Sequence, residues 1–173
     1  MGDPKRQRKK FSKPSHPWQK ERIESERGIL EQYGLRRKQE IWKMTSMLRN
    51  LLHRAKTIIG EKTSQSEIEK KQLLSKLNSL GLLKNDSKVE DVLNLNLKDI
   101  LERRLQTLVQ RKQLAKTMLQ ARQIITHEHV AIGSRKITSP SYLVSIAEEN
   151  QIRLVHPLNF MNQAQERTAE KQA

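Results

Sequence analysis

The feature that most constrains the fold is an apolar stripe at helical spacing in the first third of the chain. Apolar residues recur there at three- and four-residue steps, and Gly60 follows the last of them. This spacing predicts one amphipathic helix over roughly residues 36–59. The stripe consists of Ile41, Met44, Leu48, Leu51, Leu52, Ala55 and Ile59. The other faces of the helix carry basic residues, namely Arg36, Arg37, Lys38, Lys43, Arg49, Arg54 and Lys56.

The composition limits what can be built around this helix. Only 35% of the 173 residues are hydrophobic and 3% are aromatic, so the core is expected to be small. Cysteine is absent, which excludes disulfides and thiolate zinc sites. The apolar runs are too short to cross a membrane, and the basic N-terminus lacks the apolar stretch of a secretory signal.

Positive charge is concentrated in two parts of the chain. The total is +15, with 34 Lys or Arg against 19 Asp or Glu. Residues 1–56 carry a net charge of +10 and residues 101–146 carry +6, whereas residues 57–100 are neutral and residues 147–173 carry −1. Like charges at this density repel one another unless a polyanion binds. Nucleic acid is the expected polyanion, and a solvated lysine-rich surface is the alternative.

Three further helices are expected in the first 95 residues. Pro17 is a plausible first-turn residue of a helix that Gly34 ends. The patterns Ser64–Glu67 and Ser87–Glu90 are typical of capping boxes, so a helix is expected after each. The apolar side of the helix after Ser64 is expected to contain Ile68, Leu73, Leu77 and Leu80.

The segment after Asn96 begins with two helical patterns. Three leucines at helical spacing predict the first helix, on whose flank Arg104 and Arg111 would project about 20° apart. Thr117–Gln120 is a third capping box and predicts the second. The leucines of the first pattern are Leu101, Leu105 and Leu108.

The period then changes from helix to strand. Residues 130–137 predict a hairpin, and a glycine first in the two-residue loop Gly133–Ser134 suits a type II′ turn. Tyr142–Ile146 and Gln151–Val155 are further strand candidates. The sequence therefore predicts an α+β fold in which helices dominate. It divides into a disordered basic arm (1–17), a helical scaffold region (18–95), a small helix–helix–hairpin domain (96–156) and a polar tail (157–173).

No combination of residues indicates catalysis or a cofactor. His127 and His129 would share a face of a strand, but no third metal ligand has a recognisable spacing. Glu148 and Glu149 lie in an expected turn with nothing apolar around them to raise a carboxyl pKa. The glycines are isolated, so there is no phosphate-binding loop. The chain is expected to be neither an enzyme nor a metal or cofactor protein.

The basic residues of the hairpin domain are better candidates for a functional site. Arginine suits bidentate contacts to phosphate, and lysine supplies a point charge. RNA is favoured over DNA because no helix or strand has an obvious groove-reading face. The cluster comprises Arg103, Arg104, Arg111, Lys112, Arg122, Arg135 and Lys136. The arm adds Lys5, Arg6, Arg8, Lys9 and Lys10, and it is expected to order only on RNA.

Residues 101–143, LERRLQTLVQRKQLAKTMLQARQIITHEHVAIGSRKITSPSYL, resemble the RNA-binding domain named after small-subunit ribosomal protein four. The shared features are the paired arginines after Glu102, the segment Thr117–Gln123, the two histidines around Glu128 and the sequence Pro140–Tyr142. The basic N-terminus, His16–Trp18, Tyr33–Arg36 and Glu40–Trp42 look like the archaeal form of that ribosomal protein family. The resemblance covers nearly the whole chain.

The resemblance implies a protein of the small ribosomal subunit in the cytoplasm. Such a protein would bind small-subunit rRNA early in assembly, contact small-subunit protein five and support translational accuracy. Carried over by motif, the residues that face RNA would be Arg103, Arg104, Arg111, Arg122, Gln123, His127, His129 and Arg135. Without cysteine the chain cannot form the zinc knuckle of some bacterial members.

This sequence departs from the family pattern at three places. Gln113 and Glu128 stand where the family usually has glycine, and Ile132–Ser134 replaces the common Val-Asn-Gly. Glu128 adds a negative charge beside the two histidines. Two alternatives remain open at this stage: an assembly factor with the same domain, and an RNA-modifying enzyme such as a pseudouridine synthase.

Overall fold

The computed structural model describes residues 9, 11–61, 63–84 and 87–155. Most of the predicted basic arm and the polar tail lie outside these residues, so neither prediction is tested.

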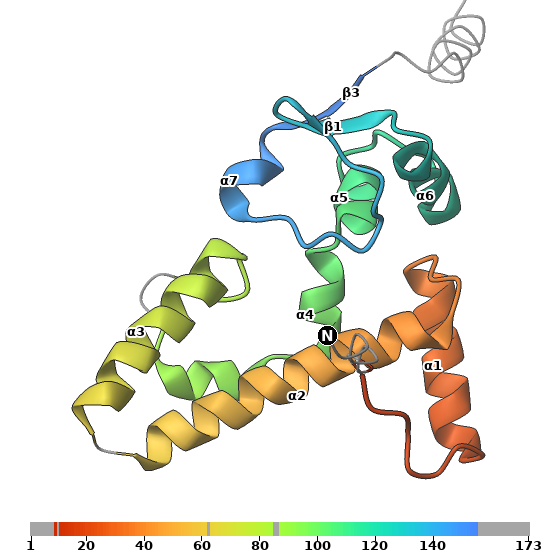
Figure 1. The fold of residues 1–173 in the computed structure, drawn as a ribbon. Helices are drawn as coiled ribbons and strands as arrows, with labels where there is room; N and C mark the ends of the chain where they lie inside the picture. The colour runs from red at the N-terminus through yellow and green to blue at the C-terminus, as the bar shows by residue number, and fades with distance from the viewer. Residues whose placement is uncertain (1–8, 10, 62, 85–86, 156–173) are drawn as a thin grey trace, which may run out of the picture.

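Figure 1 shows a long helix, α2, with the other helices of this part arranged around it and a smaller unit of helices and strands above it. The helices are α1 (Lys20–Gln32), α2 (Lys38–Gly60), α3 (Ser64–Ser79), the 3-10 helix η1 (Val89–Asn94), α4 (Leu97–Glu102), α5 (Leu105–Arg111), α6 (Met118–Thr126) and α7 (Ile146–Glu149). The strands are β1 (Val130–Ile132), β2 (Arg135–Lys136) and β3 (Ile152–Leu154).

The predicted fold class, α+β with helix dominant, is confirmed. We refer to α1–α4 and η1 as the helical region and to α5–β3 as the C-terminal unit; the domain boundary near residue 95 stays a prediction. Among the residues that the structure describes, no helix has the length and apolarity needed to span a membrane.

Helix α2 forms where the apolar stripe predicts it, but its buried face turns along its length. Ile41 packs with α1, whereas Leu51, Ala55 and Ile58 pack with α3 and η1. Ile59, expected inside, is 44% exposed. At 100° per residue Ile59 lies about 80° from Leu51. The elements that pack against the two ends of α2 lie on different sides of it, so Ile59 falls outside the face that is buried at its own end.

Helix α3 begins one residue earlier than the capping-box pattern indicates. Thr63, not Ser64, is the N-cap, and its hydroxyl accepts a hydrogen bond from the backbone N–H of Ser66. Ile68, expected in the core, is 52% exposed because it lies on the side of α3 opposite the buried Leu77. The N-cap of η1 also differs from the predicted one. The Asp91 carboxylate, and not the Ser87 hydroxyl, caps this helix, because it accepts a hydrogen bond from the backbone N–H of Lys88.

The single helix expected after Asn96 is two helices separated by a break at Arg103–Arg104. Arg104 has an extended backbone (φ −72°, ψ 141°) and forms a β-bridge with Leu143. The hydrogen bond from the backbone N–H of Leu105 to the carbonyl of Tyr142 fixes the break. Arg104 and Arg111 therefore do not share a helix flank, because tertiary contacts override a continuous helical pattern.

The C-terminal unit contains a three-stranded antiparallel sheet in the order β2-β1-β3. The predicted hairpin is present, and the φ of +58° at Gly133 is what the first residue of a type II′ turn requires. The Gln151–Val155 strand is confirmed as β3. The prediction of a strand at Tyr142–Ile146 is wrong. Leu143 forms only the isolated bridge with Arg104, and Ser145 with Glu148 caps the short helix α7.

In the part of the chain that the structure describes, four helices end on a residue in the left-handed region, and two of those residues are not glycine. Gly34 (φ +56°) and Gly81 (φ +69°) follow α1 and α3, whereas Gln113 (φ +59°) and Glu128 (φ +63°) follow α5 and α6. In each case the next backbone N–H bonds to the carbonyl five residues earlier, as in a Schellman motif. Two of the three departures from the family pattern, Gln113 and Glu128, thus stand where glycine would be least strained.

Three apolar clusters hold the elements in place. One lies inside the C-terminal unit, between α5, α6 and the sheet. The second joins α2, α3, η1 and α4, and the third joins α1 and α2 to Leu101 of α4. A side chain at Gly34 would meet Met118 of α6, with its Cβ only 2.6 Å from the Cβ of Met118. The helical region and the C-terminal unit are therefore in close contact at this point.

Candidate nucleic-acid interface

Glu40 of α2 joins the helical region to the C-terminal unit. Its Oε2 lies 2.7 Å from Nη2 of Arg104, at the break between α4 and α5. Its Oε1 lies 3.0 Å from Nη2 of Arg122 on α6. The Arg104 side chain is only 1% exposed and that of Arg122 is 25% exposed. One carboxylate thus holds two arginines that the sequence assigns to RNA binding.

The ionisation of this cluster depends on the pairing. Burial works against the charged form of Glu40, but hydrogen bonds from Arg122 and Arg104 and their charges outweigh it, so the pKa of Glu40 lies below its ordinary value. Burial also lowers the pKa of Arg104, yet a guanidinium stays protonated at any physiological pH. Nε and Nη1 of Arg104 are buried without a hydrogen-bond partner among the described residues. Among the described residues, Glu40 is therefore the carboxylate that compensates the buried charge of Arg104.

Arg103 and Lys112 are engaged with helix α7. Nη1 of Arg103 lies 2.8 Å from Oε2 of Glu149, and its Nη2 donates to the carbonyl of Val144 at 3.1 Å. Nζ of Lys112 donates to the backbone carbonyl of Glu149. These two basic residues fix α7 against the break and the end of α5.

Arg111 forms a surface pair that leaves much of its side chain in solvent. Its Nη2 and Nε lie 2.9 and 3.3 Å from the two oxygens of Glu102. The hydroxyl of Tyr33 donates to the same carboxylate at 3.0 Å. Burial, together with this hydrogen bond and the negative charge, raises the pKa of Tyr33 to about 12. The Arg111 side chain is 58% exposed, so an incoming phosphate can reach it.

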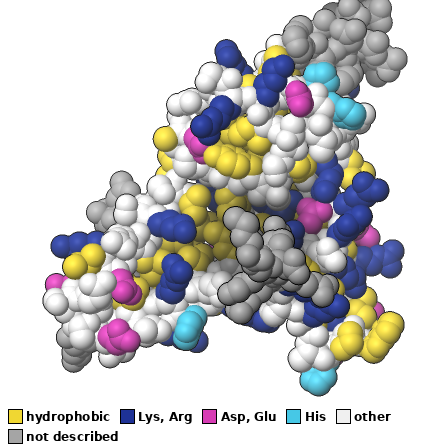
Figure 2. Space-filling model, viewed as in Figure 1, with side chains coloured by type: hydrophobic (Ala, Val, Ile, Leu, Met, Phe, Trp, Pro, Cys, Tyr) yellow, Lys and Arg dark blue, Asp and Glu magenta, His cyan; other side chains and the backbone are white. Residues whose placement is uncertain are grey.

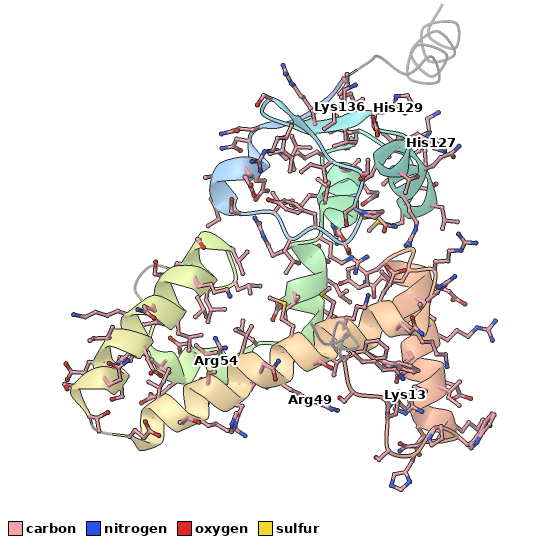
Figure 3. All side chains as sticks on the ribbon, viewed as in Figure 1. Lys13, Arg49, Arg54, His127, His129 and Lys136 are labelled. Carbon is pink, nitrogen blue, oxygen red and sulfur yellow. The ribbon has the colours of Figure 1, made fainter. Side chains whose placement is uncertain are left out.

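The remaining predicted residues of the C-terminal unit lie at its outer end. Gln123 and His127 are exposed near the end of α6, and His129 is half-buried just before β1. Arg135 and Lys136 form β2 and are both exposed. Figure 3 shows His127, His129 and Lys136 close together at this end of the unit. We call these five residues the outer tip; the exposed Glu128 lies among them.

A second basic surface lies on the helical region. Helical spacing places Lys43 and Arg54 about 20° apart on α2 and Arg49 more than 100° around the helix from both, and all three are exposed. The segment before α1 lies along this helix, since the backbone N–H of Ser12 donates to Ser46 and Arg49 donates to the hydroxyl of Ser12. Lys13 and Arg49 line the same hollow between this segment and α2, and both are labelled in Figure 3. In Figure 2, Lys and Arg side chains gather over the corner of α1 and α2.

A polar groove adjoins this surface. It has a volume of about 570 Å³ between α2 and α3, and its lining includes His53, Arg54 and Lys76. Arg54 and Lys76 also line a smaller hollow with Lys43. The helical pattern alone does not distinguish these residues from ordinary solvated charges, so the sequence does not predict that they bind RNA. They become candidates for a binding site only because they converge from α2 and α3 in the folded chain.

Two sets of predicted residues remain to be placed. Lys9 is exposed, whereas Lys5, Arg6, Arg8 and Lys10 lie outside the described residues. Within the part of the chain that the structure describes, no group of three His, Asp or Glu side chains is arranged to hold a metal ion. His127 and His129 therefore have no visible third ligand there.

Comparison with known proteins agrees with this arrangement. The S4 domain family matches residues 103–150. A small ribosomal subunit protein uS4 from Saccharolobus solfataricus is 48% identical over 153 residues, which are 88% of this chain and 84% of the relative. A protein of the same name from Ignicoccus hospitalis is 45% identical over 166 residues, which are 96% of this chain and the full length of the relative. The chain belongs to the small ribosomal subunit protein uS4 family.

Proposed function

We propose that this chain is a structural protein of the small ribosomal subunit and a primary binder of small-subunit rRNA. The observation that carries the proposal is membership of the uS4 family over almost the full length of the chain. The net charge of +15 and the exposed basic side chains on both parts of the molecule support a polyanionic partner. We propose no enzymatic activity and no cofactor.

We propose that RNA contacts two surfaces of the protein. One is the outer tip with the exposed part of Arg111. The other consists of the exposed basic side chains around α2, namely Lys43, Arg49 and Arg54, with Lys13. Lys9 and the arm residues Lys5, Arg6, Arg8 and Lys10 would extend the second surface. Folded RNA presents its phosphates in three dimensions, so two separated basic surfaces suit recognition by shape.

The buried and paired basic residues have a different proposed role. Arg104 can reach a phosphate only if it leaves Glu40. Arg103 and Lys112 can each reach a phosphate only if they give up their contacts with α7. We propose that these three residues, with Arg122, hold the C-terminal unit in position. A phosphate at the 25% exposed edge of Arg122 is compatible with this role.

The position of the protein in the subunit is part of the same proposal. We propose that it acts in the cytoplasm, joins the rRNA early in assembly and contacts small-subunit protein five and other proteins of the subunit. Support for translational accuracy follows if that contact changes as the subunit moves between conformations. These expectations come from the family resemblance.

Sucrose-gradient sedimentation tests the central proposal. Lysate of the host is separated, small subunits are washed at high salt, and the chain is quantified against other small-subunit proteins by mass spectrometry. We expect one copy per mature small subunit. Presence on precursor rRNA particles but not on mature subunits would instead identify an assembly factor.

A further inference from the structure

Trp18 is the most exposed of the large hydrophobic side chains in the described residues, at 89%. Tryptophan contributes more apolar area than any other residue and is usually well buried. The residue lies in the turn before α1, between Pro17 and Lys20. Its exposure therefore needs a reason, either a mobile turn or a partner.

The turn is not loosely attached. Nη2 of Arg22 donates to the carbonyls of His16 and Pro17 at 3.0 and 2.9 Å. Nη1 of the same guanidinium lies 2.6 Å from Oε1 of Glu26, whose side chain is 8% exposed. Glu26 also accepts a hydrogen bond of 3.0 Å from the indole N–H of Trp42 on α2. A buried carboxylate thus ties the turn to both α1 and α2.

The chain just before the turn is also held. The rings of Phe11 and Trp42 lie 6.1 Å apart, and Ser12 bonds to Ser46 of α2. Anchors on both sides leave Trp18 at the outer bend of a fixed segment. The side chain is therefore presented to solvent by the fold, in a position prepared before any partner arrives.

The charge around Trp18 indicates the kind of partner. Residues 5–20 contain seven Lys or Arg and no Asp or Glu. An apolar protein surface gains nothing from this charge, whereas RNA supplies phosphates for the lysines and unpaired bases for the ring. Aromatic side chains bind single-stranded segments by stacking on bases, with basic residues tracking the backbone.

We propose that Trp18 stacks on an unpaired base of the bound RNA. The proposal rests on the proposed rRNA function and adds a base contact to surfaces that otherwise hold phosphates. Stacking requires a flat π-face, so the contact tolerates any base and any aromatic ring. Lys13 and Lys20 flank it in the sequence and are both exposed, so they can neutralise adjoining phosphates; Lys20 would exchange its surface pair with Glu24 for one of them.

Binding of full-length protein to transcribed small-subunit rRNA tests the proposal. We expect Trp18→Phe to bind nearly as well as the wild type, and Trp18→Leu to bind roughly 5- to 150-fold more weakly, because leucine keeps apolar area but cannot stack. The slope of log affinity against log salt should stay the same in Trp18→Leu, since no phosphate contact is lost. Ile68→Ala, which removes an exposed apolar side chain from α3, is the matched control and should bind like the wild type.

Fluorescence supplies a second measurement. The chain has two tryptophans, so the emission of Trp18 is obtained as the difference between the wild type and Trp18→Phe, which keeps Trp42 and its hydrogen bond to Glu26. We expect the Trp18 emission to be quenched without a blue shift when RNA binds.

Wild-type affinity in Trp18→Leu, or unchanged Trp18 emission in a complex detected by filter binding, would overturn the proposal. A blue shift with purified small-subunit proteins but not with RNA would also overturn it. Failure of the wild type to bind rRNA at all would instead contradict the proposed function.

Discussion

The C-terminal unit and helix α2 both carry an excess of basic residues, but they use it differently. Around the C-terminal unit Arg103, Arg104, Arg111 and Arg122 each pair with a carboxylate. On α2, by contrast, Lys43, Arg49, Arg54 and Lys56 have no ion pair among the described residues and extend into solvent. Arg103 and Arg104, the paired arginines of the family motif, have side chains only 14% and 1% exposed, so they are the least available to RNA.

This difference shows that a basic motif can serve the fold and the partner at once. A buried guanidinium needs a carboxylate, and Glu40 supplies it from the other part of the molecule. Such pairs connect the two parts, while the exposed cations on each part are the proposed contacts for phosphate. The position of the outer tip relative to α2 thus depends on residues that need not touch RNA.

The largest expected effect comes from breaking the Glu40 cluster. Glu40→Gln removes the negative charge and leaves the guanidinium of Arg104 buried without compensation, at 1% exposure. We expect a loss of about 3–5 kcal/mol in the free energy of unfolding. Urea denaturation measures this free energy.

Glu24→Gln, which breaks an exposed pair with Lys20, is the control and should change stability by less than about 0.5 kcal/mol. A loss below 1 kcal/mol in Glu40→Gln would show that the cluster does not hold the two parts together.

The same cluster should make stability depend on pH. The pKa of Glu40 is lower in the folded chain than its ordinary value, so folding favours the ionised form. Its contribution is fully present above the ordinary glutamate pKa of about 4.3 and is lost as the pH falls through the lower, folded pKa. Unfolding measured between about pH 6 and pH 3 should show a steeper decline in the wild type than in Glu40→Gln. Parallel declines would argue against this role for Glu40.

The exposed set should behave in the opposite way. Arg135→Gln removes an exposed charge from β2, so we expect little change in unfolding but a loss of about 1–3 kcal/mol in rRNA affinity. The slope of log affinity against log salt should become shallower by about 0.9 if one phosphate contact is lost. Filter binding over a salt series checks both values. Lys71→Gln on the exposed side of α3 is a charge-matched control. An unchanged slope in Arg135→Gln would remove Arg135 from the proposed interface.

The sequence predicts local features of this fold better than contacts between distant segments. Helix α2, the Thr117 cap and the hairpin follow from spacing and turn chemistry within ten to twenty residues. The break at Arg104 does not, because it depends on a bridge to Leu143 nearly forty residues away. The pairing of Arg104 with Glu40 is equally invisible in the sequence. For this reason a list of basic residues predicts the partner of the protein but not which side chains remain free to bind it.

The smallest expected effect concerns the two strained helix ends. Gln113 and Glu128 occupy left-handed positions that Gly34 and Gly81 fill elsewhere in the molecule. Replacing either by glycine should stabilise the fold by roughly 0.5–1 kcal/mol, because glycine relieves the strain at a cost in unfolded-state entropy. Thermal or urea unfolding measures the gain, and Gln113→Ala, which keeps the strain, should show none.

The two glycine variants should differ in RNA binding. Both relieve strain, but only Glu128→Gly also removes a negative charge from among the outer-tip residues. We therefore expect rRNA affinity to rise in Glu128→Gly and to stay unchanged in Gln113→Gly, with the gain shrinking at high salt because it is electrostatic. Equal affinities in the two variants would mean that RNA does not approach the outer tip. In that case the exposed basic side chains of α2 would be the principal contact, and the contrast between the two basic regions would be sharper than proposed.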